Sequence, residues 1–217
     1  MCDDRLFAPQ TAALGATVLS VTKADTMEAL AAAVLRDAPD RFALGGLSMG
    51  GIVAMEVARQ APDRVAGLAL MDTNPLAESP HMQARRTPQM DKAAAGGLAS
   101  VMRDEMKPNY LSDGPDRAAI LDLCMEMALG LGPDVFIRQS LALRDRPDQT
   151  ETLRHYQGPS LVLCGRDDRL CPVARHELMH DLLPDATLRI IAGAGHLPTL
   201  ERPDQTTDAL RNWLEEI

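Results

Sequence analysis

The stretch Phe42–Val53 constrains the fold of this chain more than any other. Its sequence, FALGGLSMGGIV, is an apolar run that leads into a serine flanked by glycines, and the residues that follow have helical spacing. The segment GLSMG fits the pattern G-x-S-x-G, in which a sharp turn between a strand and a helix exposes the serine hydroxyl. We therefore expect a strand over 42–46, a helix that starts at Ser48, and no room for side chains at Gly46 and Gly50.

Ser48 is the candidate nucleophile of this turn, and the Met49 N–H is the candidate oxyanion donor. A helix that starts at Ser48 points unpaired N–H groups and the positive end of its dipole at the hydroxyl. The pattern alone does not separate a catalytic serine from a plain glycine-rich turn or a phosphate cradle, because three fixed positions in five recur by chance. Other parts of the chain must decide between them.

Composition excludes several classes of function. The chain has 217 residues and a formal net charge of -9, which suits one α/β domain and argues against a surface that binds nucleic acid. No apolar stretch is long enough to cross a membrane, and the acidic start is unlike a signal peptide. We expect a cytoplasmic protein that acts on a small molecule, without nucleic-acid or membrane partners. Four cysteines lack the spacing of metal or disulfide motifs and are predicted to be reduced thiols: Cys2, Cys124, Cys164 and Cys171.

Strand and helix patterns alternate along the chain. The residue patterns predict further strands over 17–21, 65–71, 160–164 and 187–191. They predict helices over 5–14, 173–183 and 204–217, the last facing the sheet through Ala209, Leu210, Trp213, Leu214 and Ile217. A capping box, Asp25 with Glu28, predicts the start of another helix, which Pro39 ends. Continuous apolar strands of this kind are typical of parallel sheets covered on both faces, so we predict a doubly wound, mostly parallel α/β fold.

The alternation stops between residues 75 and 156, where only helical patterns occur. We interpret this segment as a helical cap inserted into a core formed by residues 1–74 and 157–217. Six methionines lie in the cap, and they suit either an adaptable lining for the site or ordinary core packing: Met82, Met90, Met102, Met106, Met125 and Met127.

A nucleophilic serine needs a base and an orienting acid, and in this architecture both lie on loops after later strands. Asp168 follows the strand 160–164, and His196 follows the strand 187–191. The chain order is thus Ser, Asp, His, a combination far more specific than any of its parts. Asp167 and Asp72 are competing candidates for the acid.

These residues and their order resemble the α/β-hydrolase family, in particular its compact capped carboxylesterases, enol-lactonases and related acyl hydrolases with a GLSMGG-type elbow. The family pattern G-x-x-D-x-x-x-P falls on Gly165, Asp168 and Pro172, and the terminal G-x-G-H pattern falls on Gly193, Gly195 and His196. The resemblance covers nearly the whole chain.

The resemblance implies that His196 takes the proton of Ser48 while Asp168 holds the histidine in its tautomer. It implies hydrolysis of small carboxylic esters, lactones or thioesters, with no cofactor and no metal. The family normally begins with strands and a turn that are absent here, and the turn carries a second oxyanion donor. We therefore expect a sheet without its N-terminal strands, a start placed too late, and improved stability and turnover on upstream extension. The alternative is a truncated, non-catalytic remnant or ligand-binding protein.

One further motif suggests zinc. His176, Glu177 and His180 fit H-E-x-x-H, which on a helix places two imidazoles on one face, and Glu201 is conceivable as a third ligand. The helical wheel instead predicts that both histidines face solvent, opposite Ala174, Leu178 and Leu182. We interpret the pair as a chance occurrence.

Overall fold

A parallel sheet of four strands forms the centre of the computed structural model, which describes all of residues 1–217. The strands lie in chain order and are β1 (Phe42–Leu47), β2 (Val65–Met71), β3 (Ser160–Gly165) and β4 (Ala186–Ile191). The register aligns Gly46, Leu70, Val162 and Leu188 across the sheet. These four strands confirm the predictions over 42–46, 65–71, 160–164 and 187–191.

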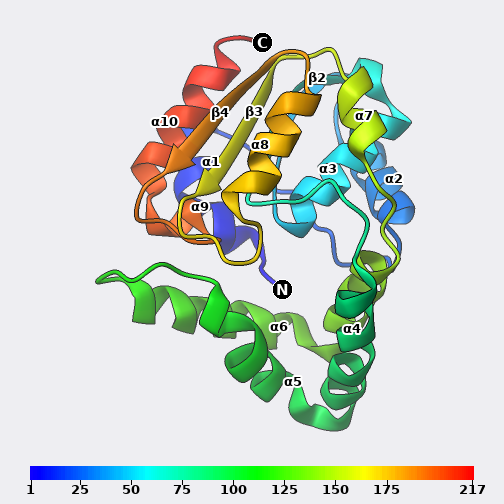
Figure 1. The fold of residues 1–217 in the computed structure, drawn as a ribbon, viewed down its shortest axis with the longest axis vertical. Helices are drawn as coiled ribbons and strands as arrows, with labels where there is room; N and C mark the ends of the chain where they lie inside the picture. The colour runs from blue at the N-terminus through cyan, green and yellow to red at the C-terminus, as the bar shows by residue number, and fades with distance from the viewer.

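Helices cover both faces of this sheet (Figure 1). One face packs on α2 (Met27–Asp37), α3 (Met49–Gln60), α7 (Thr150–His155) and α8 (Val173–Leu182), and the other on α1 (Ala8–Leu14) and α10 (Pro203–Leu214). The inner strands alternate between the two resulting cores: Leu70 and Val162 belong to the first, Ala69 and Leu161 to the second. The doubly wound, parallel α/β fold is therefore confirmed.

Residues 17–21 do not form the predicted strand. A strand needs a neighbour to share its hydrogen bonds, and this segment has none, since no strand precedes β1 and β1 pairs only with β2. The Val21 carbonyl accepts from Gln139 Nε2 at 3.1 Å, and the Thr22 carbonyl accepts from Arg138 Nε at 3.0 Å. Side chains from the cap thus supply hydrogen-bond donors only at the C-terminal end of this segment. The sheet has no strand N-terminal to β1, as expected.

The ends of two helices differ from the predictions. At the start of α2, Thr26 rather than Asp25 is the N-cap residue, and its hydroxyl accepts from the Ala29 N–H at 3.2 Å, so no capping box forms with Glu28. The last helix ends at Leu214, and the side chains of Leu214 and Ile217 remain exposed. By contrast, α1 ends at Gly15 in a left-handed conformation, as predicted.

Residues 80–155 contain helices and no strand, as predicted. The main ones are α4 (Pro80–Lys92), α5 (Leu98–Ser100) and α6 (Arg117–Arg144), which lie as a layer beside the sheet domain (Figure 1). Gly132, with a φ of 79°, breaks α6 into two helical arms. Three of the six cap methionines, Met90, Met102 and Met127, are buried in hydrophobic clusters, which favours core packing for these three. None of the helices is both long and apolar enough to cross a bilayer.

Candidate active site

Ser48 lies at the turn between β1 and α3, in a backbone conformation that non-glycine residues rarely adopt, with φ 54° and ψ -118°. A Cβ atom at Gly46 would overlap the backbone of Gly50, so the first glycine of the pattern is sterically required. The expectation for Gly50 is wrong, because a Cβ there meets nothing within 4 Å. The second crowded position is Gly51, where a Cβ would lie 2.7 Å from the Thr73 side chain.

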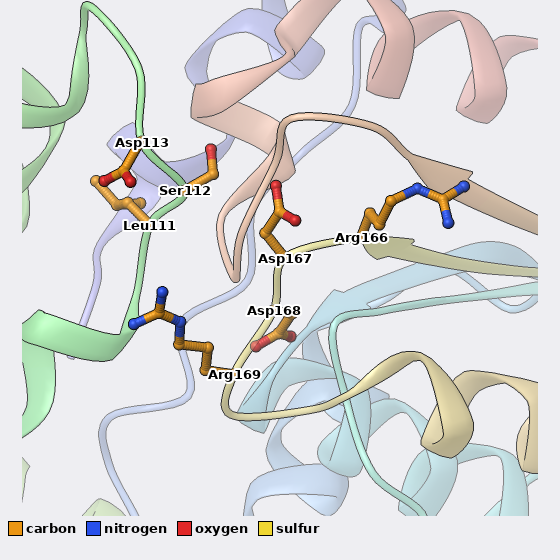
Figure 2. A pocket seen from close by; sticks show the side chains of 7 residues that line it. All are labelled: Leu111, Ser112, Asp113, Arg166, Asp167, Asp168 and Arg169. Atoms are coloured by element: carbon orange, nitrogen blue, oxygen red, sulfur yellow. The ribbon is translucent and has the colours of Figure 1, made fainter.

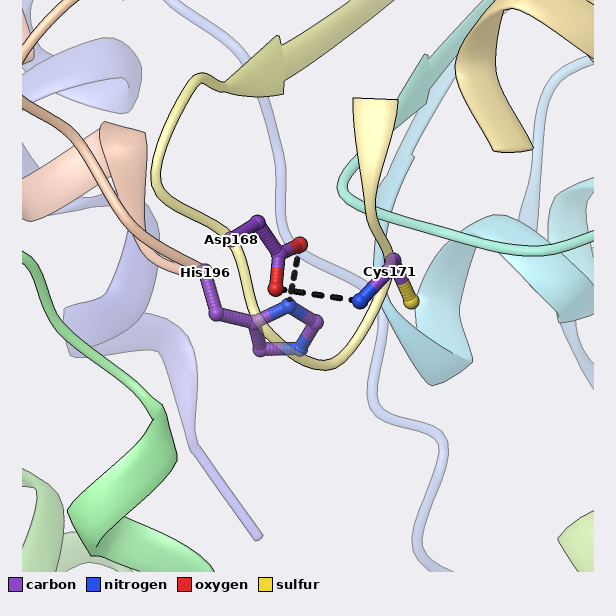
Figure 3. A group of neighbouring side chains, drawn as sticks. All are labelled: Asp168, Cys171 and His196. Atoms are coloured by element: carbon purple, nitrogen blue, oxygen red, sulfur yellow. Dashed lines mark hydrogen bonds and ion pairs between the residues drawn. The ribbon is translucent and has the colours of Figure 1, made fainter. Parts of the chain in front are cut away.

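His196 and Asp168 form a chain of hydrogen bonds with Ser48. The Nε2 atom of His196 lies 2.9 Å from Ser48 Oγ, and its Nδ1 atom lies 2.8 Å from Asp168 Oδ2. His196 comes from the loop after β4 and Asp168 from the loop after β3, and both side chains are nearly fully buried. Figure 3 shows the imidazole of His196 against the carboxylate of Asp168. The structure thus brings together the three residues that the sequence selected.

The Asp168 carboxylate is held by backbone donors as well as by the histidine. Its Oδ1 atom accepts from the Leu170 N–H at 2.8 Å and from the Cys171 N–H at 3.0 Å. Burial opposes ionisation of this carboxyl, but the hydrogen bond and charge of His196 outweigh it and lower the pKa of Asp168. Asp167 is exposed and makes no hydrogen bond with His196. The geometry therefore favours Asp168 over Asp167 as the partner of His196.

Met49 is the first residue of α3 and follows Ser48 directly in the sequence. Its N–H therefore has no hydrogen-bond partner within the helix. The carbonyl of Ser48 accepts from Thr73 Oγ1 at 2.7 Å, which ties the turn to the loop after β2. The Ser48 N–H also donates to the Met71 carbonyl at 2.9 Å, so the serine turn is bonded both to β2 and to the loop after it. The positive end of the α3 dipole lies at this turn.

Glu201 connects the histidine loop to the cap, a role that the sequence analysis missed. Its Oε1 atom accepts from the Ser112 N–H at 2.8 Å and from Ser112 Oγ at 2.9 Å. Its Oε2 atom accepts from the Gly195 N–H at 2.9 Å and from the Leu197 N–H at 3.1 Å. The chain has 31 acidic residues, and no sequence pattern marks this one as a loop-binding carboxylate.

The cap also contacts the histidine directly. The N–H of His196 donates to the Tyr110 carbonyl at 2.6 Å, and the rings of Tyr110 and His196 lie 5.7 Å apart. A Cβ at Gly195 would lie 2.7 Å from both the Tyr110 carbonyl oxygen and the Ser112 nitrogen, so this close approach requires a glycine. The glycine of the G-x-G-H pattern is therefore explained by the packing of the cap against the histidine loop.

A polar pocket of about 460 Å³ lies between the cap loop and the loop that carries Asp168 (Figure 2). Seven residues line it, of which only Leu111 is hydrophobic, and no methionine is among them: Leu111, Ser112, Asp113, Arg166, Asp167, Asp168 and Arg169. In Figure 2, the side chain of Arg169 extends from the loop that carries Asp168 toward the cap segment of Leu111 to Asp113. The pocket does not include Ser48.

The prediction that both histidines of H-E-x-x-H face solvent is wrong for His176. Its side chain is fully buried, and Nε2 accepts from the Thr73 N–H at 3.1 Å. Burial lowers its pKa to about 4, so the imidazole is neutral. The wheel failed because the helix buries the side that holds His176, Met179 and Leu182. His180 remains exposed, and the Nε2 lone pair of His176 is already occupied by a hydrogen bond.

The four cysteines are free, as predicted. Cys171 adjoins the Asp168–His196 pair, and its backbone N–H donates to Asp168 (Figure 3). Burial and the nearby Asp168 charge raise the pKa of the Cys171 thiol well above its ordinary value. A thiol in this state is a poor nucleophile, which agrees with a packing role.

Comparisons with known proteins identify the class that this fold and site define. A family model described as the alpha/beta hydrolase family matches residues 3–209. The pimeloyl-[acyl-carrier protein] methyl ester esterase of Aromatoleum aromaticum is 30% identical over 198 residues, which cover 82% of this chain and 76% of that protein. The chain belongs to the alpha/beta hydrolase family.

Solved structures agree with this assignment. A thermophilic esterase from Thermogutta terrifontis superposes with a TM-score of 0.89 and 29% identity, covering 99% of this chain and 86% of that one. The enol-lactonase from Burkholderia xenovorans LB400 gives a TM-score of 0.85 at 24% identity, covering 99% and 88%, and supports the fold alone. The relatives from Aromatoleum aromaticum and Thermogutta terrifontis are both named esterases, which confirms the expectation of an α/β-fold hydrolase that acts on ester bonds.

Proposed function

We propose that this protein is a serine hydrolase that cleaves small carboxylic esters, lactones or thioesters through an acyl-enzyme on Ser48. The single observation that carries the proposal is the continuous path from Ser48 Oγ to His196 Nε2, 2.9 Å, and from His196 Nδ1 to Asp168 Oδ2, 2.8 Å. A positioned base beside a hydroxyl, itself oriented by a carboxylate, is the arrangement that activates a serine. The esterase names of the relatives support the ester bond as the target.

The reaction follows from this arrangement. Ser48 Oγ attacks the substrate carbonyl carbon while its proton moves to His196 Nε2, and the Met49 N–H stabilises the oxyanion. When the intermediate collapses, the leaving alcohol or thiol takes the proton from Nε2 and the acyl group stays on Ser48. Water then attacks the acyl-enzyme with His196 as base, which releases the acid and restores the serine. Asp168 keeps Nδ1–H oriented and stabilises the imidazolium in both halves of the reaction.

We further propose that residues 75–156 act as a cap over a core of residues 1–74 and 157–217. The contacts of Tyr110 and Ser112 with the histidine loop support this division of labour. A segment that touches the base from outside the sheet is well placed to shape the acyl or alcohol side of the site.

A fluorophosphonate probe followed by peptide mapping tests the function directly. We expect covalent labelling at Ser48, hydrolysis of a panel of p-nitrophenyl esters of graded chain length, and loss of both in Ser48→Ala with an unchanged melting curve. Absence of label at Ser48 in folded protein would instead favour the non-catalytic, ligand-binding alternative.

The two neighbouring aspartates provide a matched pair of variants. Asp168→Asn is expected to lower kcat by up to about 10⁴-fold through the wrong histidine tautomer. Asp167→Asn changes an exposed carboxylate one residue away and is expected to alter kcat by less than about threefold. The reverse ranking would assign the acid to Asp167, and two mild effects would assign it to Asp72.

A further inference from the structure

Asp72 is a buried carboxyl beside the proposed triad whose environment suits only its neutral form. It follows β2, in a backbone conformation with φ 42°, and its side chain is fully buried. Its Oδ1 atom accepts from the Gly165 N–H at 2.9 Å, while Oδ2 has no hydrogen-bond partner among donor groups. A buried carboxylate oxygen without a donor is costly, whereas the same oxygen bearing a proton can itself donate.

The acceptor beside this oxygen is the carboxylate of Asp168. Gly165, whose N–H binds Asp72, accepts from the Asp168 N–H through its carbonyl at 3.3 Å, and the neighbouring side chains of Asp72 and Asp168 are both fully buried. Two buried carboxyls in contact do not both ionise, so one proton is shared by the pair. Asp168 has three donors, namely His196 Nδ1 and the N–H groups of Leu170 and Cys171, and Asp72 has one. The distribution of donors places the negative charge on Asp168 and the proton on Asp72.

The charges around the pair favour the same distribution. Burial and the charge of Asp168 raise the pKa of Asp72 well above its ordinary value, and the pKa of Asp168 is lowered. Burial keeps the nearby thiols protonated and His176 neutral, so the facing groups that carry charge are Glu201, Asp168 and, when protonated, His196. The titratable groups that surround the pair are Cys164, Cys171, His176, His196 and Glu201.

We propose that Asp72 is a positioning residue of the active site, a neutral carboxylic acid whose Oδ2–H donates to the Asp168 carboxylate and holds it in line with His196 Nδ1. This inference rests on the proposed triad. The neutral Asp72 side chain gives Asp168 a fourth hydrogen bond without adding a second negative charge beside the His196 imidazole. The N–H of Gly165 and the fully buried side chain keep Asp72 in place for this contact.

Infrared spectroscopy tests the protonation state without reference to catalysis. A difference spectrum between wild type and Asp72→Asn at neutral pH is expected to show the carbonyl stretch of one buried, protonated carboxylic acid, present only in wild type. Asp167→Asn, which removes an exposed carboxylate, serves as the matched control and should leave the band unchanged. A missing band in wild type, or a band that survives in Asp72→Asn, would overturn the proposal.

Kinetics of two variants test the positioning role. Asp72→Ala removes the donor and is expected to lower kcat by about 10- to 100-fold with little change in KM, since a hydrogen bond to a charged group is lost. Asp72→Asn keeps a neutral donor toward Asp168 and an acceptor for Gly165, and should recover most of that loss. Equal damage by both variants, or an Asp72→Ala enzyme as fast as wild type, would contradict the proposal.

The pH profile of kcat/KM separates positioning from a general loss of structure. The acid limb of Asp72→Asn should coincide with that of wild type, because a neutral group is replaced by a neutral group. A shift of the limb to lower pH would show that wild-type Asp72 is charged and stabilises the imidazolium, which overturns the inference. If the fluorophosphonate probe fails to label Ser48 while the infrared band persists, the hydrolase function fails and the neutral Asp72 stands.

Discussion

Replacing Glu201 by glutamine should loosen the histidine loop while leaving the three proposed catalytic residues intact. If the amide oxygen of the new side chain replaces Oε1, it keeps the contacts with Ser112, and the amide nitrogen then faces the Leu197 N–H at the Oε2 position, 3.1 Å away. The amide NH₂ group of the glutamine would then face the Leu197 N–H, so two donors oppose each other and the buried Leu197 N–H loses its acceptor. The opposite orientation turns the amide nitrogen toward Ser112 and is no better.

The cost can be worked out from these contacts. A buried N–H left without its charged acceptor costs roughly 1.5–3 kcal/mol, and the remaining bonds weaken because a neutral oxygen replaces a carboxylate oxygen. We expect Glu201→Gln to lower the free energy of unfolding by about 2–4 kcal/mol. For a chain of this size that corresponds to a decrease in Tm of about 5–15 °C.

Urea unfolding and ester kinetics together test this reasoning. The matched control is Glu216→Gln on the exposed C-terminal turn, for which we expect no measurable change in stability. Because the loop that carries His196 is affected, kcat should fall by about 10-fold or more even at temperatures where the variant is folded. If Glu201→Gln unfolds at the same urea concentration as wild type, or if its kcat is unchanged, the Glu201 carboxylate does not hold the loop that carries His196.

Two further predictions concern the turn at Ser48 and the buried histidine. Gly46→Ala should lower kcat at least about 100-fold, because its Cβ would overlap the backbone of Gly50. Gly50→Ala should lower kcat far less, since a Cβ at that position meets no other atom within 4 Å. Similar kcat values for the two variants would contradict the packing argument. His176 has a pKa of about 4 in the folded protein, below its value of 6.5 in the unfolded chain. Its contribution to the free energy of unfolding is therefore complete above about pH 6.5 and is lost as the pH falls toward 4. Urea unfolding should show a total loss of about 3 kcal/mol over this pH range. The variant His176→Gln keeps an acceptor for the Thr73 N–H and should not show this decrease of stability with pH. The same pH dependence in both proteins would be inconsistent with a neutral, buried His176.

Features that rest on local patterns of residues are predictable from the amino-acid sequence alone. The short apolar runs at 65–71 and 160–164 indicate buried parallel strands, because a strand covered on both faces has apolar residues at successive positions. The serine turn and the order of Ser48, Asp168 and His196 were also readable, since loops after parallel strands meet at one edge of a sheet. These features depend on residue type and spacing, which can be taken directly from the amino-acid sequence.

Features that depend on a neighbour distant in the sequence are visible only in the folded chain. Residues 17–21 have the composition of a strand but no partner strand, and Arg138 and Gln139 instead donate to the carbonyl groups at its end. His176 is buried, and its Nε2 atom accepts from the Thr73 N–H, 103 positions away, a contact that a helical wheel cannot show. The acceptor role of Glu201 likewise depends on a cap loop 89 positions away. A hydrogen bond between distant segments exists only once the chain has folded, so residue type and spacing alone do not specify it.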